Sequence, residues 1–100
     1  MTFLNYVKRR YLTTAAATKL EETVKSMMSN DAFIKSLPDM ISAAKAGIQV
    51  GHMQGKPHMV NFNSLFLAYC EAIHKKDAAA ALKVADALVK DGHGEAFGLS

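Results

Sequence analysis

The sequence has few of the residues that cross-link or interrupt a fold: one cysteine, two prolines and no tryptophan in 100 residues. A single cysteine, Cys70, cannot form a disulfide within the chain, so we expect a cytoplasmic or other reducing compartment rather than secretion. No run of about 18 apolar residues occurs, so we expect no membrane span. The segment MTFLNYVKRRYL does not have the order of a secretory signal, because its charges lie inside its apolar stretch instead of before it.

Half of the residues are apolar, sixteen are alanine, and the apolar positions recur at helical rather than alternating spacing. A chain of this length holds one hydrophobic core and has no room for two. We therefore expect an all-α fold, a single compact bundle of four to five helices with a C-terminal antiparallel helical hairpin. The domain is expected over residues 1–92, with 1–13 inside it or packed separately as an N-terminal helix. A flexible glycine-rich tail is expected over 93–100.

Capping residues and apolar spacing predict where the first helices begin and end. A short helix is expected over 3–11 and a second over about 14–28. The Ser-Asn-Asp segment at 29–31 indicates a stop and a restart, because all three residues are good caps. Pro38 stands where a helix begins comfortably, so the next long helix is expected over 37–54.

A break at Gly55-Lys56-Pro57 separates this helix from a helical hairpin over 62–91. The connection between the two arms of the hairpin is short, which forces them to run antiparallel. The expected caps are Asn61 or Asn63 for the first arm, Asp77 for the second arm, and Gly92 as the residue that ends it.

The helix over 37–54 is apolar almost all round. One face carries Leu37, Ile41, Ala44 and Ile48, and nearly the opposite face carries Ala43, Ala46, Val50 and Met53. A helix of this kind is buried on both sides or contacts a partner. We interpret it as the central helix of the bundle, with more apolar surface than so small a core needs.

Small residues recur every four positions along this helix, at Ala43, Gly47, Gly51 and Gly55. Each glycine inside a helix costs about 0.5–1 kcal/mol relative to alanine, which indicates that another element approaches closely on that side. That element is either another helix of the same chain or a partner. Gly47, Val50, Gly51 and Met53 are the residues that we expect to contact a partner.

Positive charge is concentrated near the N-terminus. Lys8, Arg9, Arg10 and Lys19 are the only charged side chains in the first 20 residues, whereas the rest of the chain carries eight basic and nine acidic side chains. Such a patch attracts phosphate backbones or acidic protein surfaces. These four cations would make the contacts if the protein bound nucleic acid. Two of them, together with aromatic neighbours, also suggest a second patch for a protein partner, made of Phe3, Tyr6, Arg9, Arg10 and Tyr11.

Cysteine and histidine supply a further alternative, a small helical metal-binding protein or enzyme. Cys70 and His74 are four residues apart on one helical face, and His52 and His58 flank the glycine turn. Their spacing matches no standard zinc pair, and no phosphate-binding loop or known catalytic motif is present. We therefore expect no catalytic residue, no metal and no cofactor.

The hairpin resembles a tetratricopeptide unit at Phe62, Leu65, Tyr69, Ala78, Leu82 and Ala85. The likeness covers about a third of the chain, without a second copy, although such units stack in series. Phe66 stands where that family has glycine, Leu82 replaces an aromatic residue, and Lys90 replaces the closing proline. The resemblance implies peptide or protein binding in a helical groove.

These patterns lead to one main hypothesis, a small non-catalytic interaction protein that acts as a modulator, inhibitor or assembly subunit. Its partner is another protein or a second copy of the chain. Nucleic-acid binding is the first alternative, and the metal protein or enzyme is the second.

Overall fold

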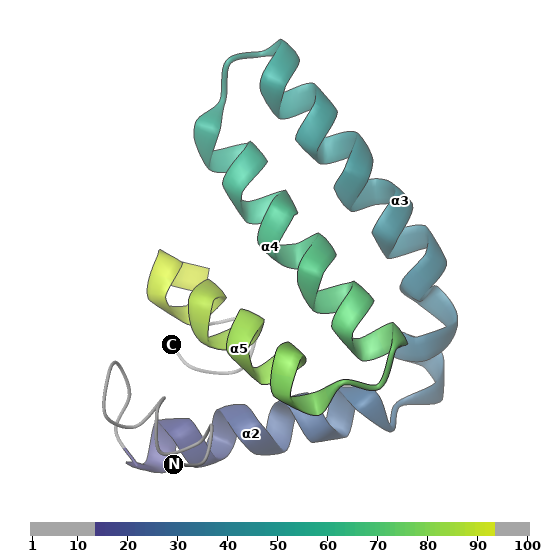
Figure 1. Cartoon of the computed structure of the whole chain (residues 1–100), viewed down its shortest axis with the longest axis vertical. Helices are drawn as coiled ribbons and strands as arrows, with labels where there is room; N and C mark the ends of the chain where they lie inside the picture. Colours follow the sequence, from purple (N-terminus) through teal and green to yellow (C-terminus); the bar gives the residue numbers. More distant parts are fainter. Residues whose placement is uncertain (1–13, 94–100) are drawn as a thin grey trace.

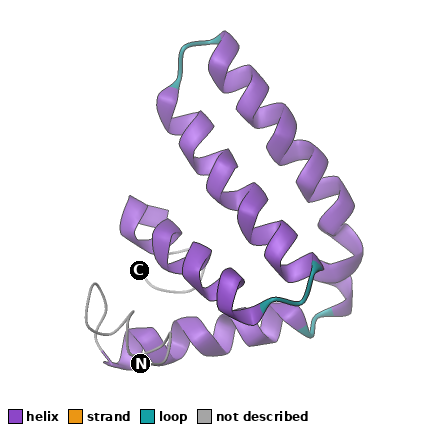
Figure 2. Cartoon of the chain, viewed as in Figure 1, coloured by secondary structure: helices purple, strands orange, loops and turns teal. Residues whose placement is uncertain are grey.

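The computed structural model describes residues 14–93, and this part of the chain is helical throughout apart from short turns (Figures 1 and 2). The all-α, compact fold expected from the sequence is confirmed. The helices, in chain order, are α2 (Thr14–Met28), α3 (Asp31–Met53), α4 (Pro57–His74), α5 (Ala78–Leu88) and the π-helical turn η1 (Val89–His93).

Two long helices, α3 and α4, lie side by side and form the tall part of the molecule (Figure 1). The shorter α5 turns back along the lower half of α4, and α2 crosses the base beneath α5. The upper half of the α3–α4 pair therefore extends beyond the other helices, and α4 is the one described helix that runs beside the upper part of α3.

The hydrophobic core lies at the base, where all four α-helices meet. Its buried residues are Leu20 and Val24 from α2, Leu37 from α3, Tyr69, Cys70, Ala72 and Ile73 from α4, and Ala81, Leu82, Ala85 and Leu88 from α5. Burial of a large aliphatic side chain contributes about 1.5–3 kcal/mol, so this cluster supplies most of the driving force for folding. Further up, the buried residues of α3 are small, Ala44 and Gly51.

The start of α3 differs from the sequence prediction. The helix begins at Asp31 and continues through Pro38, instead of restarting there. Asn30 caps it, because its side-chain oxygen accepts a hydrogen bond of 3.0 Å from the backbone N–H of Phe33. This cap and the apolar side chains that follow it outweigh the loss of one helical hydrogen bond at Pro38.

The start of α4 also differs from the prediction, since the helix begins at Pro57. Proline suits the first helical position, where its missing N–H would have no partner within the helix. Asn61 and Asn63 are consequently inside α4 and do not cap it. The side chain of Asn63 donates to the carbonyl of Met59, and that of Asn61 reaches Asp91.

The start of the last helix was predicted correctly. Asp77 caps α5, since its carboxylate accepts a hydrogen bond of 3.1 Å from the N–H of Ala80. Gly92 has a φ of 92°, in the left-handed region that favours glycine, and it lies in the π-helical turn that follows α5. Ala78 lies in the first turn of α5 and is exposed.

The helix predicted over 3–11 lies outside the described residues, and so does the tail predicted over 93–100 apart from its first residue, His93, which belongs to η1. Among residues 14–93, no helix has the length and apolar character needed to cross a bilayer.

Candidate interaction surface

An apolar stripe follows the side of α3 that no other described helix covers. Ala43, Ala46, Val50 and Met53 project within about 80° of arc on this side, and we call them the outer face of α3. Both alanines are exposed, as are Val50 (37%) and Met53 (83%). Among the described side chains, the exposed large hydrophobic ones are Val50 and Met53, which lie one turn apart on α3.

The two glycines expected at a partner surface contact α4 of the same chain. Gly51 is buried, and a Cβ at this position would lie 2.8 Å from Cγ2 of Val60 and 3.1 Å from its backbone nitrogen. At Gly47, a Cβ would lie 2.5 Å from Cγ of Asn63. The glycines therefore allow α3 and α4 to approach closely, which supports the interpretation of these two residues as packing positions within the chain.

The division between these residues follows from helical geometry. Gly47 and Gly51 lie about 80° and 120° around α3 from the centre of the outer face, on the side that α4 occupies. Of the four helical residues proposed to contact a partner, Val50 and Met53 are exposed, Gly47 is half-buried and Gly51 is buried.

The N-terminal patch predicted from the sequence belongs to a segment outside the described residues. Phe3, Tyr6, Arg9, Arg10 and Tyr11 lie outside the described residues, as does Lys8 from the nucleic-acid alternative. Lys19, the remaining cation of that alternative, is exposed on α2.

The cysteine and histidine residues do not form a site. Cys70 has no exposed surface, and burial, with a smaller contribution from Glu71, raises the pKa of its thiol to about 11. A thiol of this kind stays protonated near neutral pH, and it is a poor nucleophile and metal ligand. By contrast, His74, His52 and His58 are exposed. Within the described residues, no group of three or more His, Cys, Asp or Glu side chains could hold a metal ion.

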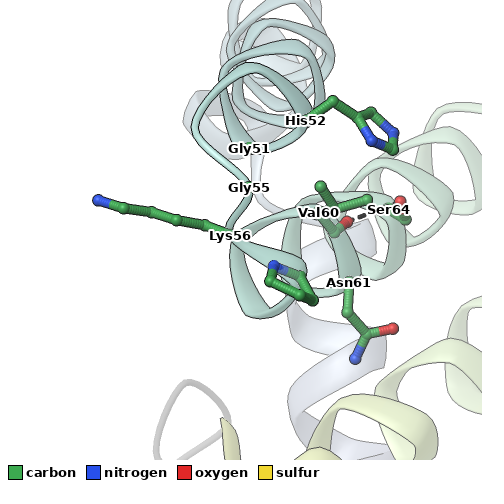
Figure 3. A pocket seen from close by; sticks show the side chains of 8 residues that line it. Gly51, His52, Gly55, Lys56, Val60, Asn61 and Ser64 are labelled. Atoms are coloured by element: carbon green, nitrogen blue, oxygen red, sulfur yellow. Dashed lines mark hydrogen bonds between the residues drawn. The ribbon is translucent and has the colours of Figure 1, made fainter.

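An open depression of about 400 Å³ lies beside the turn that joins α3 to α4 (Figure 3). Its lining residues are Gly51, His52, Gly55, Lys56, Pro57, Val60, Asn61 and Ser64, among which there is no carboxylate. The Lys56 side chain extends away from the others (Figure 3). The Ser64 hydroxyl donates a 2.7 Å hydrogen bond to the carbonyl of Val60, so it is not paired with a general base.

A polar contact that sequence reasoning missed joins α4 to η1. The Asn61 amide donates a 2.9 Å hydrogen bond to Oδ2 of Asp91, and Nε2 of His93 lies 3.4 Å from the same oxygen. The ring of His93 also lies against Phe62, with 4.7 Å between centroids. These contacts hold the end of the C-terminal helix against α4. No sequence pattern indicated these contacts, because Asn61 and Asp91 are 30 residues apart.

Comparison with known proteins does not assign the chain to a family. No protein-family model matches it, and neither does any curated protein or solved structure with which it was compared. The resemblance to a tetratricopeptide unit therefore stays a likeness of one hairpin.

Proposed function

We propose that this protein is a small non-catalytic interaction module, a modulator, inhibitor or assembly subunit, that binds a protein partner through the outer face of α3. The observation that carries the proposal is the joint exposure of Val50 and Met53 on one face of α3. This helix packs mainly against α4, so within the described fold it is not the central helix that the sequence predicted. A single exposed apolar side chain is ordinary, but two large ones aligned with two exposed alanines make a continuous stripe.

The spacing of the outer face suits a helical partner. Its residues follow one another at intervals of three, four and three positions, which is the pattern of anchors in a helix that contacts another helix or a groove. Met53 adds a flexible and polarisable side chain that adapts to the surface it meets. The outer face therefore combines two small alanine side chains, which have no rotamers to order, with the adaptable side chain of Met53.

The charge around the outer face also favours burial. Between residues 40 and 55, the only lysine, arginine or acidic residue is Lys45, which lies about 120° around α3 from the centre of the outer face. The neighbours on one edge are the uncharged Ser42 and Gln49, both exposed. A partner could cover these four apolar residues without taking a charged side chain out of water. The polar edge resembles the rim of an ordinary interface.

The fold holds the outer face rigidly. Close packing of Gly47 and Gly51 against α4 fixes the upper part of α3, and Leu37 anchors its lower part in the core. A preformed helix loses little conformational entropy when a partner binds, so even a small apolar stripe contributes usefully to affinity.

Photo-cross-linking from the outer face tests this proposal. A photoreactive amino acid replaces Met53, and in a control protein it replaces Ala68, an exposed residue of α4. Both proteins are irradiated in their native cells, and the adducts are identified by mass spectrometry. We expect a discrete adduct from position 53 and none of the same kind from position 68. Identical adduct patterns at the two positions would contradict the proposal.

A further inference from the structure

We infer that the partner bound by the outer face of α3 is a second copy of this chain, arranged antiparallel about a twofold axis that passes between Ala46 and Val50. The inference rests on the proposed function, since it names the partner of that same surface. It is carried by the way in which small and large side chains, and opposite charges, are distributed along α3.

Side-chain size along the outer face is self-complementary in the antiparallel arrangement. The two small residues, Ala43 and Ala46, come first along the helix, and the two large residues, Val50 and Met53, follow. A twofold axis midway between Ala46 and Val50 places each Val50 opposite the other copy's Ala46. The same axis places each Met53 opposite Ala43. Every large side chain then meets a small one, which permits close packing of the two helices.

Charge is complementary in the same register. Asp39 is exposed one turn before Ala43 and lies at the centre of the outer face in projection. Lys56 is exposed in the turn just beyond Met53 and extends away from the depression of Figure 3. The axis that pairs Met53 with Ala43 also brings each Lys56 near the other copy's Asp39. The two ends of the stripe therefore attract one another in the dimer.

A parallel arrangement lacks both features. It would set Met53 against Met53 and Ala43 against Ala43, which leaves a gap at one end and crowding at the other. It would also bring Lys56 near Lys56 and Asp39 near Asp39, and such like-charge pairs oppose association.

The described helices leave room for the second copy. Leu37, which points into the core, lies about 160° around α3 from the centre of the outer face, so α2 and α5 are on the far side.

The outer face covers about three turns of one helix. The area that it can bury is smaller than the roughly 800 Å² per partner that a stable dimer buries. The dimer is consequently expected to be weak and to form with rising concentration.

Sedimentation velocity over a wide range of concentration tests for self-association of the full chain. We expect the weight-average mass to rise from monomer towards dimer. Ala46→Glu should weaken dimerisation at least tenfold, because it places a carboxylate against the other copy's Val50 on each side of the axis, where the charge would lose water without gaining a partner. Ala68→Glu is the matched control, the same substitution at an exposed alanine of α4, and it should leave dimerisation unchanged. Circular dichroism verifies that both variants keep the helical fold.

Disulfide trapping distinguishes the two orientations. Ala46→Cys and Val50→Cys are prepared as separate proteins in a Cys70→Ala background. Each protein is oxidised by itself, and an unoxidised mixture of the two is oxidised in parallel. Antiparallel pairing predicts cross-linked dimers mainly in the mixture, because position 46 of one copy faces position 50 of the other. A parallel dimer would instead cross-link each protein with itself.

Charge reversal tests the register. Asp39→Lys and Lys56→Asp should each weaken the dimer about threefold or more, and the two substitutions together should restore it. Failure of the double variant to recover would overturn the antiparallel register.

The result of photo-cross-linking separates this inference from the proposed function. An adduct of position 53 with a second copy supports both. A chain that stays monomeric at every concentration, but forms an adduct with a foreign protein, overturns the homodimer and leaves the outer face as an interaction surface. A monomeric chain without a specific adduct overturns both.

Discussion

Gly51 of α3 faces Val60 of α4 so closely that a methyl group at position 51 would lie 2.8 Å from Cγ2 of Val60. The backbone nitrogen of Val60 is also near, at 3.1 Å, so a side-chain rotation alone would not relieve the contact. This relationship sets the distance between the two long helices. It also explains why a helix with an exposed apolar face carries glycine on its other side.

Gly51→Ala is expected to destabilise the protein. Alanine improves helix propensity by about 0.5–1 kcal/mol, but overpacking against α4 costs about 1–3 kcal/mol. The free energy of unfolding, measured by urea denaturation, should therefore fall by about 0.5–2 kcal/mol. A rise in stability would show that nothing presses on this position.

The effect of Gly47→Ala should depend on Asn63. The Asn63 amide lies over Gly47, and it is held there by a 2.8 Å hydrogen bond to the carbonyl of Met59. Alone, Gly47→Ala should lower or leave unchanged the free energy of unfolding, because the amide must move and lose this bond. In an Asn63→Ala background the same change should raise stability by about 0.5–1 kcal/mol. Equal effects in the two backgrounds would contradict the contact.

Pro38→Ala should stabilise the protein, because α3 continues through this position. The substitution supplies the N–H that can bond the carbonyl of Ile34, and it removes the steric conflict of the proline ring. Proline inside a helix is about 3 kcal/mol less favourable than alanine. We expect a gain of about 1–3 kcal/mol in urea denaturation, since Pro38 is exposed and its replacement leaves no cavity. A loss of stability would mean that a helix does begin at this residue.

Stability should decline at high pH through Cys70. Its pKa is raised from 9.0 to about 11 in the folded protein, chiefly by burial and then by Glu71. Because the folded state holds the thiol proton more tightly, this contribution is fully present below pH 9 and is lost as pH rises through about 11. Burial raises the pKa of Tyr69 as well, so that residue adds a fall in the same direction.

The contribution of Cys70 is isolated by comparison with Cys70→Ala. Urea denaturation from neutral pH to about pH 11 should show a steeper loss of stability in the original chain than in the variant. Parallel curves would contradict the raised thiol pKa. Because Cys70 is buried, thiol reagents should also modify it only after the protein is denatured.

Sequence patterns predicted the class of fold and the core of α2, where Leu20 and Val24 are both buried. They misplaced the start of α3 because Pro38 suits a helix start, whereas the Asn30 cap and the core contact of Leu37 decide the boundary. They misplaced the start of α4 because asparagine is a good cap in isolation. Local propensity could not show that Asn63 would instead lie across Gly47.

The candidate surface could be predicted only in part. The apolar positions of α3 indicated more than one buried face, and Val50 and Met53 are indeed not covered by the described chain. The glycines on the same helix could pack inside or outside, and the choice depended on where α4 lies. That is a tertiary relationship, which helical periodicity alone does not contain.

The central claim, that a partner covers the outer face of α3, is tested most directly by hydroxyl-radical footprinting of the methionines. Met53 is 83% exposed, whereas Met27, Met28, Met40 and Met59 are half-buried and serve as internal references. In dilute purified protein, Met53 should be oxidised faster than these four references. Inside native cells, its oxidation relative to the references should fall markedly as the partner covers it. An unchanged relative rate in cells would contradict the account.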